Sequence, residues 1–290
     1  MVLTGLPDLP DVPGGVTDHV REAIADLTED LARLPGVTAV VLGGSWATGQ
    51  AAPGYASDLD LYVYAPAEPE LSDRRAIAER QAAPGTKVEV GNTYWEPGDE
   101  WTHRRGLAVD IMYRAPGWLD AELDRVLVEH RASLGYTTCV WHNVRWSAPV
   151  VDVDGWYARA QQRAAVPYPE PLRAAILARN APLLRDAIPA LNRQLIKAAD
   201  RRDRVGMLDR AAALLVSYFD VLFALNRVTH PGEKRQLRWA AGTCPWRPEH
   251  LDELVERFVA AVGGDPAAIP AAPDALVHPL LVLVDRHGAD

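Results

Sequence analysis

The hydrophobic pattern of this chain changes at a proline-rich segment, residues 166–171 (VPYPEP). Before it, apolar residues recur either at helical spacing or in short alternating runs, so helices and strands are mixed. After it, the spacing is helical throughout, at 174–184, 188–199, 205–226, 250–262 and 275–285. The pattern predicts an α+β fold: a first domain over 1–166, with a mixed sheet flanked by helices, and an all-α helical bundle over 167–290.

Within the first domain the strands are expected from runs of β-branched and apolar residues. These runs lie at 37–42, 59–64, 87–94, 107–113 and 148–153. Helices are expected at 17–34, 69–81, 116–132 and 155–164. Residues 95–106 are mostly polar and are interpreted as a connection between two strands.

Composition limits the classes of function. The 290 residues are 48% hydrophobic and 24% charged, which is ordinary for a globular protein. A net charge of −9 argues against a protein that holds duplex nucleic acid through its phosphates, although a local basic pocket for one nucleotide remains compatible. Lysine occurs only at Lys87, Lys197 and Lys234, and we expect Lys197, beside a charged run, to lie on the surface.

Two cysteines, Cys139 and Cys244, cannot form a disulfide framework, and they fit a reducing compartment. With His142 and His250 they could be imagined as zinc ligands, but their spacing repeats no known zinc pattern, and no zinc is expected. The N-terminal segment is acidic and proline-rich, unlike a signal peptide, and no apolar run approaches the roughly 20 residues of a membrane span. We therefore expect a cytoplasmic protein.

Three aspartates form the candidate metal and catalytic site. Asp58 and Asp60 are two residues apart on a predicted strand, so their carboxylates project from the same face. Carboxylates so close repel each other unless a cation lies between them, and Mg²⁺ prefers such oxygen ligands and shares them with phosphates. Asp110 lies inside the apolar strand 107–113, which indicates that it has a partner, and an adjacent strand could bring it beside the pair.

A glycine-serine turn precedes these aspartates. Gly44 lets the backbone approach a phosphate closely, and Ser45 adds a hydroxyl group at the start of a short segment. Backbone N–H groups at such a start favour an anion. Metal ligands next to a phosphate-binding turn predict phosphoryl or nucleotidyl transfer. No GxxxxGK sequence is present, so a P-loop is excluded.

The stretch from Gly44-Ser45-Trp46-Ala47-Thr48-Gly49 to Asp58-Leu59-Asp60-Leu61, followed by Asp110, resembles the signature of the polymerase β nucleotidyltransferase superfamily. Within it, the chain looks like the bacterial antibiotic nucleotidyltransferases that act on aminoglycosides or lincosamides and carry a helical C-terminal domain. The resemblance covers residues 37–114. Thr48 departs from the family, which often has arginine there.

The resemblance also implies that the helical domain closes over the nucleotide and offers a cation to its triphosphate. Lys234 is the candidate, because it follows the turn signal His230-Pro231-Gly232 at the end of a predicted helix. Arg235, Tyr218 and Asn226 are the predicted companions, and the last two lie eight residues apart, close to the same helix face.

The expected reaction is attack of an acceptor hydroxyl on the α-phosphorus of a nucleoside triphosphate, with ATP the expected donor. Asp110 would complete the metal site or accept the proton, and Glu89 is the alternative base. Trp95, Trp101 and His103 could line an acceptor pocket. The expected acceptor is a small hydroxylated molecule of the aminoglycoside type. Transfer to a protein or tRNA, or a non-catalytic nucleotide-binding regulator, are the alternatives.

Overall fold

A computed structural model describes residues 18–48 and 57–288 of the chain. It divides into two compact units. Unit 1 consists of Met1–Leu123 and Asn143–Val166, and unit 2 of Asp124–His142 and Pro167–Asp290. Each unit is described by itself, and the predicted domain limits stay a prediction. Gly49 and the spacer up to Ala56 lie outside the described residues.

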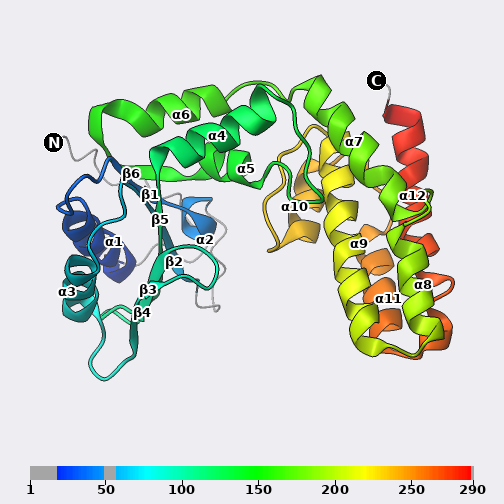
Figure 1. Ribbon diagram of the computed structural model, residues 1–290, viewed down its shortest axis with the longest axis horizontal. Helices are drawn as coiled ribbons and strands as arrows, with labels where there is room; N and C mark the ends of the chain where they lie inside the picture. Colours follow the sequence, from blue (N-terminus) through cyan, green and yellow to red (C-terminus); the bar gives the residue numbers. More distant parts are fainter. Residues whose placement is uncertain (1–17, 49–56, 289–290) are drawn as a thin grey trace. The chain divides into compact units, whose positions relative to one another are not determined.

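Unit 1 is built on a six-stranded mixed sheet with the order β3-β4-β5-β2-β1-β6 (Figure 1). The central strands β2 and β5 run parallel, whereas the other neighbouring pairs run antiparallel. The strands are β1 (Ala39–Leu42), β2 (Leu59–Tyr64), β3 (Val88–Asn92), β4 (Gly98–Thr102), β5 (Ala108–Arg114) and β6 (Ala148–Asp152).

Seven helical segments in the described part of the chain accompany this sheet. Two of them, α4 and α5, cross the limits of unit 1, so that the segment between them belongs to unit 2. The segments are α1 (Asp18–Leu31), α2 (Gly44–Ala47), α3 (Leu71–Gln81), α4 (Pro116–Leu127), α5 (Cys139–Trp146), the 3₁₀ turn η1 (Val153–Gly155) and α6 (Trp156–Ala164).

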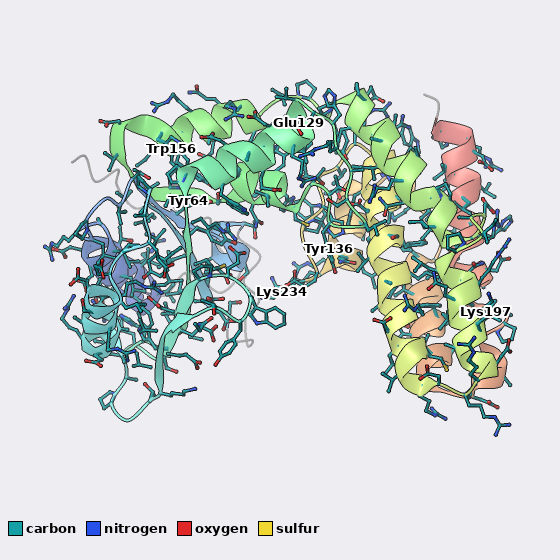
Figure 2. All side chains as sticks on the ribbon, viewed as in Figure 1. Tyr64, Glu129, Tyr136, Trp156, Lys197 and Lys234 are labelled. Atoms are coloured by element: carbon teal, nitrogen blue, oxygen red, sulfur yellow. The ribbon has the colours of Figure 1, made fainter. Side chains whose placement is uncertain are left out.

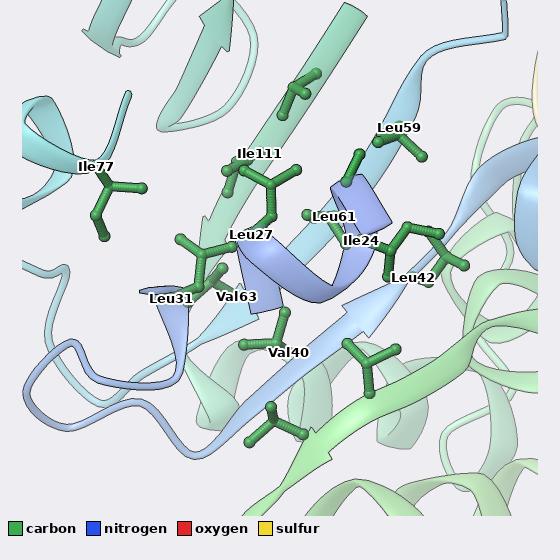
Figure 3. Packing of buried hydrophobic residues seen from close by; sticks show 14 of the residues in the cluster. Ile24, Leu27, Leu31, Val40, Leu42, Leu59, Leu61, Val63, Ile77 and Ile111 are labelled. Atoms are coloured by element: carbon green, nitrogen blue, oxygen red, sulfur yellow. The ribbon is translucent and has the colours of Figure 1, made fainter. Parts of the chain in front are cut away.

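Helices α1 and α3 cover one face of the sheet and close the core of unit 1 (Figure 3). Ile24, Leu27 and Leu31 repeat at three- and four-residue spacing, so they form one apolar stripe on α1. The stripe packs on alternate strand residues, among them Leu61 and Ile111, which are fully buried. Because side chains alternate along a strand, the intervening residues, including Asp60 and Asp110, belong to the opposite face.

Strand β4 was not predicted, because residues 95–106 were interpreted as a connection. Its polar sequence conceals a buried ion pair: Asp99 is 1% exposed and accepts hydrogen bonds from Arg74 of α3, one of them 2.9 Å from Nε to Oδ2. Tyr113 also donates its hydroxyl to Asp99, at 2.8 Å. Removing one member of such a pair typically costs about 3–5 kcal/mol, so Asp99 fastens β4 to α3 and β5.

Unit 2 is a helical bundle around the long helix α9. Helices α7, α8, α10, α11 and α12 all contact α9. With η2, these elements are α7 (Glu170–Leu184), α8 (Leu191–Asp200), α9 (Arg204–Leu225), α10 (Gln236–Thr243), α11 (Leu251–Gly263), η2 (Pro266–Ala268) and α12 (Ala272–His287). The predicted α+β class, with a mixed sheet followed by helices, is confirmed.

A buried carboxyl on α9 holds the segment between α4 and α5 in unit 2. Asp220 is 2% exposed and accepts hydrogen bonds from the backbone N–H of Thr137 at 3.0 Å and from its hydroxyl at 2.7 Å. The Asn180 amide on α7 donates to Asp220 at 3.3 Å and to the Ser133 carbonyl at 3.0 Å. Burial raises the pKa of Asp220 from 3.8 to about 6, although the bonds from Thr137 oppose the shift.

This raised pKa predicts a specific dependence of stability on pH. Between the two pKa values the native chain binds more protons at Asp220 than the unfolded chain, so its contribution is full below pH 4 and is lost as the pH rises through 6. Relative to Asp220→Asn, the wild type is expected to lose about 1–3 kcal/mol of unfolding free energy across that window. Chemical denaturation of both proteins from pH 4 to 7 measures this, and parallel curves would contradict it.

One helical stretch of the described chain, Pro266–His287, is long and apolar enough to cross a membrane by length and composition alone. No such run was expected from the sequence. A core helix passes the same test, and α12, which contacts α7, α9 and α11, buries Leu276, Val277 and Leu280. The stretch is therefore weak support for a membrane span.

Candidate active site

The turn between β1 and β2 is fitted closely to Asp60. The backbone N–H of Gly43 donates to the Asp60 carbonyl at 2.9 Å. Gly44 follows in the left-handed region, with φ +59°, and a Cβ on it would overlap the Asp60 carboxylate, lying 2.8 Å from its Cγ. Only glycine adopts this conformation without strain and leaves that space open. The turn is therefore shaped around the Asp60 side chain.

Ser45 is the second residue of the single helical turn α2, and Thr48 is its C-cap residue. Thr48 Oγ1 donates to the carbonyl oxygens of Gly44 at 3.2 Å and Ser45 at 3.4 Å. The position where the family often has arginine thus carries a side chain that bonds its own turn. Ser45 is half-buried.

Asp60 and Asp110 are direct neighbours across the parallel pair β2–β5. Adjacent strands lie about 4.8 Å apart, and partners in register point to the same face, so the two half-buried carboxyl groups share one surface. Asp58 comes immediately before the first residue of β2 and is exposed. Extended by one residue beyond β2, the alternation of the strand predicts the same side for Asp58 as for Asp60.

Two further carboxylates lie in register with Asp110 on the neighbouring strands β4 and β3. Glu100 of β4 pairs in register with Asp110, and Glu89 of β3 pairs in register with Glu100. Glu100 is not among the site residues predicted from the sequence, because β4 was not predicted. A signal was present in the apolar Trp101 beside it, since a buried ring next to an exposed acid is typical of a strand. Lys87 binds the outermost carboxylate, Glu89, at 2.7 Å.

The donor chemistry of the aspartates fits a divalent metal ion, because carboxylate oxygens are hard ligands. In the described ranges, however, no three His, Cys, Asp or Glu side chains are gathered as a metal-binding group. The backbone therefore brings the strands of Asp60 and Asp110 together, with Asp58 one residue before β2, whereas the orientation of the three carboxylates as ligands stays a prediction. The close approach of the Gly44 backbone to the Asp60 carboxylate fits a carboxylate that is held in one position.

Arg114 is the last residue of β5 and lies on the same sheet face as Asp110. Arg114 of β5 forms two hydrogen bonds with Glu96, at 2.7 and 2.9 Å, and its guanidinium lies 4.2 Å from the ring centre of Tyr62. Burial would lower the pKa of Arg114, but Glu96 and the nearby tyrosines raise it above its ordinary value. Tyr64 beside it packs on Trp156 of α6, with ring centres 5.1 Å apart (Figure 2).

Lys234 lies in unit 2 on the connection between α9 and α10 and is exposed (Figure 2). Its neighbour Arg235 is the N-cap residue of α10. The connection is anchored by His230, whose backbone N–H donates to Thr138 at 2.8 Å and whose Nδ1 accepts from Gly232 at 3.1 Å. Burial lowers the pKa of His230 to about 3, with a smaller effect of His142, so the ring is neutral at neutral pH.

Tyr218 and Asn226, which were predicted to contact the nucleotide, make contacts within unit 2. Tyr218 is fully buried inside unit 2, where its ring packs on Phe219, so it offers no surface to a ligand. The Asn226 amide donates to the carbonyl oxygens of Leu222 and Trp246, each at 2.8 Å, and accepts from the Trp246 N–H. Helical spacing identified their helix but could not identify its buried side, and their role in binding gains no support.

Of the three residues expected to line an acceptor pocket, Trp95 is exposed, whereas the other two lie inside unit 1. Trp101 packs in the core, and His103 is fully buried and bonds Gln81 at 3.2 Å. Burial, followed by the charge of Arg104, lowers the pKa of His103 to about 4. Trp101 and His103 therefore present almost no exposed surface to an acceptor.

The cysteines do not assemble a zinc site within the described residues. Cys139 lies 3.5 Å from His230 Nδ1, whereas His142 bonds Thr229 at 2.9 Å. Burial raises the pKa of the Cys139 thiol, which opposes the thiolate form that binds metal. The pKa of Cys244 is likewise raised by burial, to about 11.

A family model described as "Nucleotidyltransferase domain" matches residues 24–133, the part of the chain that runs from α1 through β1, the Gly43-Gly44 turn, β2 and β5. Residues 24–133 are therefore similar to nucleotidyltransferase domains. The predicted polymerase β superfamily and the predicted enzyme class are confirmed, and such domains act on nucleoside triphosphates, generally with a divalent metal. The resemblance to antibiotic nucleotidyltransferases stays a prediction.

Two solved structures are similar to this chain at low identity. A nucleotidyltransferase-like protein from Exiguobacterium sibiricum is 13% identical, with a TM-score of 0.43, over 92% of this chain and 77% of the other. The CCA-adding enzyme of Thermotoga maritima, complexed with tRNA, is 12% identical, with a TM-score of 0.30, over 92% and 66%. At such scores neither decides a function. No curated protein matches the sequence.

Proposed function

We propose that this nucleotidyltransferase transfers a nucleoside monophosphate from a magnesium-bound nucleoside triphosphate to a hydroxyl group of a small molecule. The observation that carries the proposal is the register of Asp60 and Asp110 on neighbouring parallel strands, beside a glycine turn fitted to Asp60. This combination offers oxygen ligands on one side and backbone N–H groups on the other, as a bound metal–triphosphate requires.

Asp58 and Asp60 would hold the metal, with Asp110 completing the set or accepting the proton of the attacking hydroxyl. A bound Mg²⁺ would neutralise charge on the phosphate oxygens as the bond to the leaving pyrophosphate breaks. Glu89 is the weaker candidate base: it lies two strands from Asp110, and Lys87 binds its carboxylate at 2.7 Å. A general base must reach the proton that it removes, which favours Asp110.

The nucleotide is proposed to be ATP. Gly44 and Ser45 would approach its phosphates, since Gly44 has no side chain and is exposed, and Ser45 is half-buried beside it. Lys234 is the proposed cationic contact for the triphosphate, which its exposure on an anchored connection supports. Lysine serves phosphate groups as a compact charge with several donors.

The acceptor is proposed to be a cationic hydroxylated molecule of the aminoglycoside type. Glu100 and Glu89 extend the negative surface away from Asp110, and the chain carries a net charge of −9. Negative potential at a site raises the local concentration of cationic substrates. The same charge disfavours tRNA as an acceptor.

Mass spectrometry of acceptors tests this function. The full chain is incubated with Mg-ATP and a panel of aminoglycosides, lincosamides and neutral sugars, and pyrophosphate release is followed in parallel. We expect the mass of one AMP on a cationic member of the panel. AMP found on protein or added tRNA would favour those acceptors instead. ATP binding without pyrophosphate release from any acceptor would favour a nucleotide-binding regulator.

A further inference from the structure

A tryptophan in the α2 turn reaches the residue that precedes Asp58. The indole N–H of Trp46 donates to the backbone carbonyl of Ser57 at 3.2 Å, across eleven positions of the sequence. The ring is half-buried and packs against the core of unit 1. Its position is thus fixed by packing, and the hydrogen bond transmits that position to the chain entering β2.

Asp58 is the least constrained of the three aspartates. Strand pairing of β2 with β5 begins one residue later, at Leu59, and Asp58 itself is exposed. On the far side, Gly43 holds the Asp60 carbonyl. Ends of strands open more readily than their middles, so a second fixed point before Asp58 limits how far this residue can move.

We propose that Trp46 is a positioning residue for the metal site: its bond to Ser57 holds the backbone of Asp58 where its carboxylate can act with that of Asp60. This inference rests on the proposed function, since it assigns Asp58 as a metal ligand. Thr48 supports the arrangement, because its hydroxyl closes the helical turn that carries Trp46. Sub-ångström placement of reacting groups has large effects on rate, so one hydrogen bond at this place has a measurable consequence.

Trp46→Phe removes the indole N–H and keeps an aromatic ring, and the chain offers a matched control. Trp101 also packs in the core of unit 1, and its buried indole N–H has no hydrogen-bond partner in the described structure. Trp101→Phe therefore makes the same chemical change without removing a bond. Thermal unfolding of both variants establishes that they are folded.

Two readouts on the full chain test the proposal: amide hydrogen exchange of residues 57–61 without metal, and Mn²⁺ affinity measured by electron paramagnetic resonance. Loss of one neutral hydrogen bond is worth a factor of about 5. We expect Trp46→Phe to speed the exchange and to weaken Mn²⁺ binding, each by about fivefold, whereas Trp101→Phe changes neither.

Unchanged exchange in Trp46→Phe would overturn the fixed point at Ser57. Faster exchange with unchanged Mn²⁺ affinity would overturn its effect on the metal site alone. A wild-type chain that binds no Mn²⁺ would overturn the proposed metal site and, with it, this inference. The last result is recognised in the wild type before any variant is compared, so the two failures are distinguishable.

Discussion

Replacing Asp60 with asparagine is expected to abolish nucleotidyl transfer, with a loss of about 10³-fold or more in kcat, because a neutral amide cannot hold a divalent metal against the triphosphate. Asn is nearly isosteric with Asp, so its amide occupies the space beside Gly44 and unit 1 keeps its fold. Pyrophosphate release with the acceptor found by mass spectrometry measures the loss, and circular dichroism measures the melting temperature.

Asp110→Asn is expected to behave alike, because Asp110 is the register partner of Asp60. The matched control is Glu79→Gln, which removes an exposed carboxylate from α3 on the other side of the sheet. That variant is expected to keep wild-type turnover. Substantial turnover by Asp60→Asn would contradict the metal assignment, whereas a large fall in its melting temperature would indicate that Asp60 acts through the fold.

The sequence predicted the central strand because its alternation is clean. Leu59, Leu61 and Val63 are fully buried on the side of α1, and Asp60 lies on the other face, as a period of two requires. The prediction of helices after residue 166 succeeded for a similar reason, since long amphipathic segments carry the strongest periodic signal. The adjacency of Asp60 and Asp110 was anticipated as a possibility, but only strand pairing gives the register.

The failures share a physical cause, which is that polar partners distant in the sequence decide local structure. Strand β4 contains Asp99, whose burial depends on Arg74, 25 residues away. The segment between α4 and α5 joins unit 2 through Thr137 and Asp220, which are 83 residues apart. No window of local sequence contains such pairs, so a polar run is interpreted as a connection.

Gly44 and Gly36 both have a positive φ, but only Gly44 lies against a side chain of the candidate site. Comparing their alanine variants therefore distinguishes the effect of displacing Asp60 from the backbone strain that both variants share. Gly44 has φ +59° and Gly36, in the turn after α1, has φ +78°. A Cβ at Gly36 would meet nothing within 4 Å, whereas one at Gly44 would overlap the Asp60 carboxylate. Both alanine variants carry the backbone strain of about 1–2 kcal/mol, but only one displaces a carboxylate.

Gly44→Ala is therefore expected to lower kcat by about 100-fold, because a displacement of the order of 1 Å at a reacting centre has that effect. Gly36→Ala is expected to lose stability by about 1–2 kcal/mol and to keep its turnover. Chemical denaturation and initial rates at saturating Mg-ATP measure both quantities. Equal activities in the two variants would contradict the fit between the turn and Asp60.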